Sequence, residues 1–130
     1  KVIASMARAG ALWVEGVEQL RTYGSEGQLD VPGRPHVVFT PGHTHGHCSL
    51  HFAGRGAVIV GDAFVMVDPY TGWTGPRLVA RAATADSALA IASLDALAAV
   101  EADRLLTGHG PAWRRSASEA AARAREAGVA

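Results

Sequence analysis

The 130-residue sequence has little of what secreted, membrane-spanning or polyanion-binding proteins need. It contains one cysteine, Cys48, so no disulfide can form within the chain. Twelve basic residues balance twelve acidic ones, which leaves no net charge to attract nucleic acid or an anionic membrane. The longest strongly apolar run, residues 57–60, is far shorter than the roughly 20 residues that cross a membrane. We therefore expect a soluble, cytoplasmic protein that binds neither nucleic acid nor membranes.

The sequence does contain enough apolar residues, 48%, to build the core of one domain. Its first residues already follow a helical pattern, with Val2, Ile3, Met6 and Ala9 on one face, and no methionine precedes them. We therefore interpret the chain as a single-domain fragment of a longer protein. Residues 1–27 form a weakly patterned lead-in.

The remaining residues, 28–130, alternate between patterns of short strands and of helices. Short runs bounded by turn residues predict five strands, at 28–31, 35–40, 48–52, 57–60 and 104–107. In the third strand Cys48, Leu50 and Phe52 alternate with polar residues, so we expect these three side chains to face the core. The fourth is apolar throughout, which is typical of a strand covered on both faces.

Two helices complete the pattern. Thr84 or Asp86 can cap a helix whose apolar side chains recur at helical spacing and should pack on the sheet. The members of this stripe are Ile91, Leu94, Leu97 and Ala98. Ser116 and Glu119 form a capping box for a last helix that runs to about Ala127. The order of elements indicates an α/β fold, with a mixed sheet and flanking helices.

Histidine is concentrated beside one predicted strand. Five of the six histidines lie between residues 36 and 51, and a loop after the strand contains His43, His45 and His47. Neutral imidazole binds zinc, iron and copper. Asp62 and His109 each follow another predicted strand, and ligands commonly bind at the carboxyl ends of strands in α/β proteins. Polar side chains that follow three strands would thus lie together at one edge of the sheet, which predicts a metal site there.

Three short motifs then point to a family. They are Thr40-Pro-Gly-His43-Thr-His45-Gly-His47, Gly61-Asp62-Ala-Phe64 and Thr107-Gly108-His109-Gly110. In order and spacing they resemble the carboxyl-terminal half of the metallo-β-lactamase fold hydrolases. The resemblance runs from about Leu29 to the final helix. It implies one half of a sandwich in which two β-sheets lie between helices.

The resemblance also implies a role for each motif residue. His43 and His109 would be metal ligands, and Asp62 would bridge two metals and hold the attacking water as the catalytic carboxylate. His47 would support the loop rather than bind metal. The implied cofactor is zinc, as two ions in the complete site, with iron or manganese as alternatives. We expect no metal role for the other histidines, of which His36 and His51 should lie on a solvated strand face and His45 on the loop.

The other signature of the family, His-x-His-x-Asp-His, is absent from these residues. In the family it belongs to the amino-terminal half, which supplies the remaining ligands. The implied function is metal-dependent hydrolysis, with activated water attacking an ester, thioester, amide or phosphoester of a small-molecule substrate. We expect the chain alone to be inactive. The expected partner is the missing amino-terminal half or a second copy, because the helices can cover only one face of the sheet.

Residues 64–81 predict a long loop, because they contain two prolines and two glycines. Its Tyr70, Trp73 and Arg77 are candidates for a substrate pocket wall. Arg77 could pair with an anionic group, or it could simply pack over Trp73.

Two other functions compete with a hydrolase of this kind. A truncated relative could keep the fold half and act only as a binding or assembly module. A histidine-triad nucleotide hydrolase is disfavoured, because its histidines alternate with apolar residues on a strand. Here Thr44 and Gly46 separate the histidines, and Pro41-Gly42 signals a loop.

Overall fold

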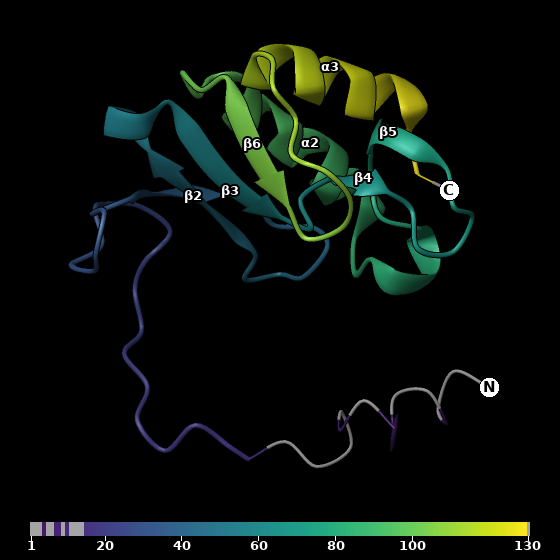
Figure 1. Cartoon of the computed structure of the whole chain (residues 1–130). Coiled ribbons are helices and arrows are strands. Elements are labelled where there is room, and N and C mark those ends of the chain that lie inside the picture. The colour runs from purple at the N-terminus through teal and green to yellow at the C-terminus, as the bar shows by residue number, and fades with distance from the viewer. Residues whose placement is uncertain (1–3, 5–6, 9, 11–14, 130) are drawn as a thin grey trace.

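The computed structural model describes residues 4, 7, 8, 10 and 15–129. Val2, Ile3, Met6 and Ala9, on which the first helix was predicted, therefore lie outside the described residues. Residues 15–27 are exposed and form no helix or strand, and they run outside the layered body of the molecule (Figure 1).

A four-stranded mixed sheet forms the centre of the molecule (Figure 1). In spatial order its strands are β1 (His36–Phe39), β2 (Cys48–Phe52), β3 (Ala57–Gly61) and β6 (Arg104–Thr107). Neighbours are antiparallel except for β3 and β6, which are parallel. Strands β1, β3 and β6 therefore point the same way, and their carboxyl ends share one edge of the sheet.

Four of the five predicted strands are present, but the first is not. The segment predicted at 28–31 forms only an isolated bridge between Gln28 and His36. The pairing ends there because Pro32 has no N–H to donate and Gly33 takes a left-handed conformation with φ of 86°.

Two α-helices lie on the same side of this sheet (Figure 1). Helix α2 (Ser87–Ala98) begins at Asp86, whose side chain accepts from the N–H of Leu89, and α3 (Ala117–Ala127) begins at Ser116, which accepts from the N–H of Glu119. Both caps satisfy N–H groups that have no partner inside the helix. Short 3₁₀ turns occupy Ala53–Arg55 (η1) and Arg81–Ala83 (η2). Among the described residues, no helix has the length and apolar character needed to cross a membrane.

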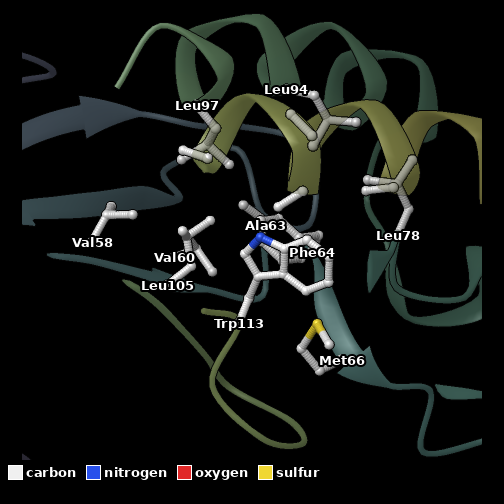
Figure 2. Close-up of a cluster of buried hydrophobic side chains, with 14 of the residues drawn as sticks. Val58, Val60, Ala63, Phe64, Met66, Leu78, Leu94, Leu97, Leu105 and Trp113 are labelled. Carbon is white, nitrogen blue, oxygen red and sulfur yellow. The ribbon is translucent and has the colours of Figure 1, made fainter. Parts of the chain in front are cut away.

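The core lies between the sheet and these helices (Figure 2). Val58, Val60 and Leu105 point from β3 and β6 toward Leu94 and Leu97 of α2. The predicted helix stripe is wrong at one position, since Ile91 is 36% exposed. The helix is turned slightly, so that the small Ala90 and Ser93 lie in the interface instead.

Within the described residues no helix lies against the opposite face of the sheet, which we call the open face. Its Phe39, Ile59 and Leu106 are 42%, 41% and 41% exposed. The expectation that residues 57–60 are covered on both faces is therefore wrong for this chain. Side chains alternate along β3, so only Val58 and Val60 reach the helices.

The orientation predicted for β2 is also wrong. Leu50 is paired with Ile59, and paired residues share a face, so Cys48, Leu50 and Phe52 lie on the open face. Ser49 points to the helices and is fully buried. His51 pairs with Val58 and lies on the covered face, where its Nε2 is buried, contrary to the solvated face we expected. The pattern misleads because the alternation along β2 shows which residues share a face, but not which of the two faces the helices cover.

Residues 64–81 form a compact hairpin rather than the long loop predicted. Strands β4 (Val65–Val67) and β5 (Thr74–Arg77) pair in a second, two-stranded sheet. Asp68 closes the turn between them, because its carboxylate accepts from the N–H of Tyr70 and the hydroxyl of Thr71, at 2.8 Å each. The prolines and glycines that suggested a loop occupy the turn and β5.

Candidate metal centre

Three predicted site residues come together at the edge where β1, β3 and β6 end. Asp62 Oδ2 lies 3.7 Å from Nε2 of His43 and 3.8 Å from Nε2 of His109. The side chains of Asp62, His43 and His109 are 27%, 22% and 49% exposed. The cluster is thus open to solvent on the His109 side and more enclosed on the His43 side.

The loop that carries His43 is fastened to the start of α2. The backbone N–H groups of Ala85 and Asp86 donate to the carbonyls of His43 and Gly42, at 3.1 and 2.9 Å. Gly42 is pressed against the helix, since a Cβ there would lie 2.3 Å from the backbone of Ala90. Only glycine permits this approach, and its φ of 137° is unfavourable for any other residue.

His47 connects this loop to Asp62. Its Nε2 accepts from the backbone N–H of Asp62 at 3.2 Å, while its Nδ1 lies 2.9 Å from Oγ1 and 3.1 Å from the carbonyl of Thr40. Burial is the main cause that lowers the pKa of His47, and the charge of nearby His43 lowers it further. A neutral ring that accepts at Nε2 carries its proton on Nδ1 and donates it to Thr40.

The hydrogen bonds continue from Thr40 into the sheet. Thr40 Oγ1 lies 3.0 Å from the hydroxyl of Ser49, which donates to the carbonyl of Val60 at 3.4 Å. Both hydroxyl residues are fully buried. The network joins the ends of β1, β2 and β3 behind the cluster, so it limits how far the loop can move relative to Asp62.

His109 is placed by two glycines and by the hairpin. The N–H of Gly108 donates to the carbonyl of Gly61 at 2.8 Å, and a Cβ on Gly108 would lie 2.2 Å from Oδ1 of Asp62. The carbonyl of His109 accepts from Met66 of β4 at 2.9 Å. The absence of a side chain at Gly108 leaves the space that the Asp62 carboxylate occupies.

The donor set suits a zinc ion, although its atoms stand slightly too far apart. Two ligand atoms on one tetrahedral zinc are about 3.4 Å apart, given bonds of about 2.1 Å. The pairs formed by Asp62 with His43 and His109 are a few tenths of an ångström longer. Within the described residues no set of three or more His, Cys, Asp or Glu side chains has ligand geometry as it stands. Asp62 Oδ1 and His43 Nδ1 are nevertheless buried without a hydrogen-bond partner, so both groups have unused capacity.

Comparison with known proteins identifies the family of this chain. Residues 7–109 match the family model of the metallo-beta-lactamase superfamily, well over half of the chain, with His43, Asp62 and His109 all inside the match. The chain belongs to the metallo-β-lactamase superfamily. The match confirms the family expected from the three motifs.

Solved structures of the superfamily share the fold. A metallo-beta-lactamase family protein from Thermus thermophilus has a TM-score of 0.63 and 25% identity, over 84% of this chain and 35% of its own. The metallo-beta-lactamase FIM-1 from Pseudomonas aeruginosa, in its mono-zinc form, has a TM-score of 0.60 and 24% identity, over 94% of this chain and 51% of its own. These likenesses confirm the α/β fold class.

Among curated proteins, a hydroxyacylglutathione hydrolase from Gloeobacter violaceus is 59% identical over 29 residues. That segment is 22% of this chain and 12% of the relative. The chain therefore spans a small part of this relative and about half, or less, of the solved superfamily structures.

The other predicted site residues of this superfamily member are spread over the hairpin and sheet. Tyr70 and Trp73 are 65% and 61% exposed, and the Arg77 guanidinium lies 4.8 Å from the centre of the Trp73 ring. The hairpin borders the cluster because β4 is hydrogen-bonded to the carbonyl of His109. His36 and His45 are exposed and do not join the cluster.

Three residues that shape the site were missed by sequence reasoning. Thr40 and Ser49 form the buried network behind His47, and Gly108 makes room for Asp62. A glycine directly before a candidate ligand was a usable signal for Gly108. The two hydroxyls gave none, because their burial follows from the packing of the helices.

Proposed function

We propose that this chain supplies part of the metal centre of a metal-dependent hydrolase. His43, Asp62 and His109 would hold the metal. Zinc is the proposed ion, with two in the complete site, and iron or manganese would suit the same donors. The observation that carries the proposal is that Oδ2 of Asp62 faces the Nε2 atoms of two histidines, at 3.7 and 3.8 Å.

When bound, zinc supplies Lewis acidity and lowers the pKa of a coordinated water toward neutrality. Asp62, which lies between the two histidines, would be the catalytic carboxylate of this chain and would orient the attacking water. His47 is a positioning residue, because it holds the backbone N–H of Asp62 and the His43 loop together. The bond attacked is an ester, thioester, amide or phosphoester of a small molecule.

The relatives support this class of reaction. One relative carries the name of a hydrolase, and one structural neighbour is described with a bound zinc ion. We further propose that Tyr70, Trp73 and Arg77 form a wall of the substrate pocket beside His109. Tyr70 and Trp73 are exposed and the half-buried Arg77 stacks on Trp73, which leaves aromatic surface and a cation available to a substrate.

The decisive experiment is a zinc titration of the apo chain by calorimetry, with single variants. His43→Ala, Asp62→Asn and His109→Ala should each weaken zinc binding at least tenfold. The matched control is His45→Ala, which removes an exposed histidine from the same loop and should leave binding unchanged. Equal zinc affinity in the three ligand variants and in the control would refute the proposed centre.

An activity assay separates the hydrolase from a binding or assembly module. The zinc-loaded chain alone should hydrolyse lactone, thioester and phosphodiester probes no faster than free zinc, since the other ligands would come from the missing half or a second copy. Turnover should appear when that partner is added and should disappear with Asp62→Asn. Zinc binding without turnover in the assembled protein would support the module instead.

A further inference from the structure

Two histidines that the metal centre does not use are neighbours on the sheet. His36 of β1 is paired with His51 of β2 in the antiparallel register, so both side chains leave the sheet on the same face. His51 is also paired with Val58, which places the two histidines on the face that carries the helices. The Cβ atoms of residues paired in this way are about 5 Å apart.

The pair lies at the end of the sheet remote from the metal centre. His36 is the first residue of β1, whereas the loop with His43 follows the last residue of this strand. The strand from His36 to Thr40 extends over about 13 Å. Since β1 is the edge strand of the four-stranded sheet, His36 is exposed, and His51 beside it is half-buried. An ion from solvent can therefore reach the pair.

Both rings have a nitrogen that can take a ligand. Nε2 of His51 is buried and has no hydrogen-bond partner within the described residues, so a new ligand for this ring costs no existing hydrogen bond. Nε2 of His36 lies 3.4 Å from the amide nitrogen of Gln28, which is a long contact. Because an amide nitrogen only donates, Nε2 of His36 accepts and carries no proton, which is the form of imidazole that binds metal.

We propose, contrary to the expectation from the sequence, that His36 and His51 form a second site for a divalent transition-metal ion. Imidazole nitrogens bind such ions at about 2.0 to 2.1 Å. Rings whose Cβ atoms are about 5 Å apart can each direct one nitrogen to the same ion, once the His51 ring turns toward His36. Cu²⁺ should bind most tightly, because it leads the order of affinities of first-row divalent metals for nitrogen ligands.

The proposed site has two protein ligands. Within the part of the chain that the structure describes, no group of three His, Cys, Asp or Glu side chains includes this pair, so water would fill the remaining positions of the ion. The proposal does not rest on the proposed hydrolase function, because the pair shares no ligand with the cluster around Asp62.

Copper titration tests the pair in a chain whose metal centre has been disabled by His43→Ala and His109→Ala. Calorimetry should find one Cu²⁺ per chain, and Mg²⁺, which prefers oxygen ligands, should not bind. Loss of a group that only supports a ligand costs about 10- to 100-fold in affinity, so His36→Gln and His51→Gln should each weaken copper binding by about tenfold or more. The matched control is His45→Gln, which removes an exposed histidine outside the pair and should leave binding unchanged.

Electron paramagnetic resonance of the bound copper separates a ligand from a residue with a structural role. The disabled chain should show coupling of copper to two imidazole nitrogens, and His36→Gln should reduce the coupling to one. His36→Gln is the decisive variant, because an exposed side chain can be replaced without a change in the core, and circular dichroism verifies its fold. Absence of copper binding, unchanged affinity in His36→Gln, or coupling to a single nitrogen when both histidines are present overturns the proposal.

Discussion

At the scale of single residues, small groups set the position of the metal ligands. His47 touches Asp62 and Thr40 through different ring nitrogens, so one neutral imidazole links the ends of two strands. Gly108 contributes by lacking a side chain. The metal ligands are thus oriented by neighbours that would not bind metal themselves, which is the usual arrangement in metal sites.

Substitution of Gly108 tests this dependence. Gly108→Ala should weaken zinc binding about tenfold or more, because the new Cβ would lie 2.2 Å from Oδ1 of Asp62 and must displace the carboxylate. The control is Gly46→Ala in the His43 loop, where a Cβ would meet nothing within 4 Å. Calorimetry on both variants measures the effect, and an unchanged zinc affinity in Gly108→Ala would contradict it.

At the scale of elements, helix α2 has two tasks. Its buried face packs on the sheet, and the N–H groups of Ala85 and Asp86, directly before its first residue, hold the carbonyls of His43 and Gly42. The N-terminus of a helix offers N–H groups without partners inside the helix, and the ligand loop uses two N–H groups just ahead of that first turn. The local start of a helix is therefore part of the metal centre.

Substitution of the two helix caps tests whether support of the His43 loop is specific to α2. Asp86→Ala and Ser116→Ala each remove one capping hydrogen bond and should each cost about 1 kcal/mol of the free energy of unfolding. Only Asp86→Ala should also weaken zinc binding, because the start of α2 supports the His43 loop. Urea unfolding and zinc titration of both variants give the comparison. Equal zinc affinities would show that the loop holds its position without the cap.

The Asp68 carboxylate in the hairpin turn should make the stability of the chain depend on pH. The N–H of Tyr70 is the main cause that lowers the pKa of the Asp68 carboxyl from its usual value, with Thr71 and Arg77 adding to it. A lowered pKa contributes stability that is complete above the unfolded value and is lost as the pH falls through the folded value. Asp68→Asn should therefore destabilise the chain at pH 7, and its difference from the natural chain should shrink below about pH 4.

Urea unfolding at several pH values between 3 and 7 measures that difference. Asp30→Asn is the control, since the Asp30 side chain is exposed and makes no hydrogen bond within the part of the chain that the structure describes. A difference for Asp68→Asn that stays constant down to pH 3 would contradict the assigned role of the carboxylate.

At the scale of the whole molecule, the two faces of the sheet have opposite surroundings. Val60 is fully buried against the helices, and its neighbour Ile59 is 41% exposed on the open face. Exposed apolar patches of a few hundred Å² or more mark interaction sites or lead to aggregation. The open face is thus the main solubility risk of the isolated chain.

Substitutions at two neighbouring residues of β3 compare the stability contributed by the two faces of the sheet. Ile59→Thr should leave the free energy of unfolding within about 0.5 kcal/mol of the natural chain and should reduce aggregation, because threonine keeps its strand preference. Val60→Thr should cost about 1 to 3 kcal/mol, because it buries a hydroxyl in the core. Urea unfolding and light scattering measure both variants. A large loss of stability in Ile59→Thr would show that the open face is already covered within the chain.

Local patterns in the sequence were sufficient for the strands at β1, β2, β3 and β6, the Ser116 cap of α3 and the three motifs, whereas the cap of α2 stayed open between Thr84 and Asp86. Each of these depends on neighbouring residues: strand propensity bounded by glycine or proline, a capping side chain three residues from its N–H, and a ligand placed directly after a strand. They also placed His43, Asp62 and His109 at one edge, because strands that run in the same direction end together.

Only the tertiary structure decided which face each strand presents, how residues 64–81 fold, and what surrounds the ligands. The faces of β2 depend on its register with β3, which pairs Leu50 with Ile59 and turns Ser49 inward. The hairpin depends on the pairing of β4 with β5 and on the hydrogen bond from the N–H of Met66 to the carbonyl of His109. The space at Gly108 exists only because Asp62 arrives from another strand. These features come from contacts between residues distant in sequence, which local patterns do not encode.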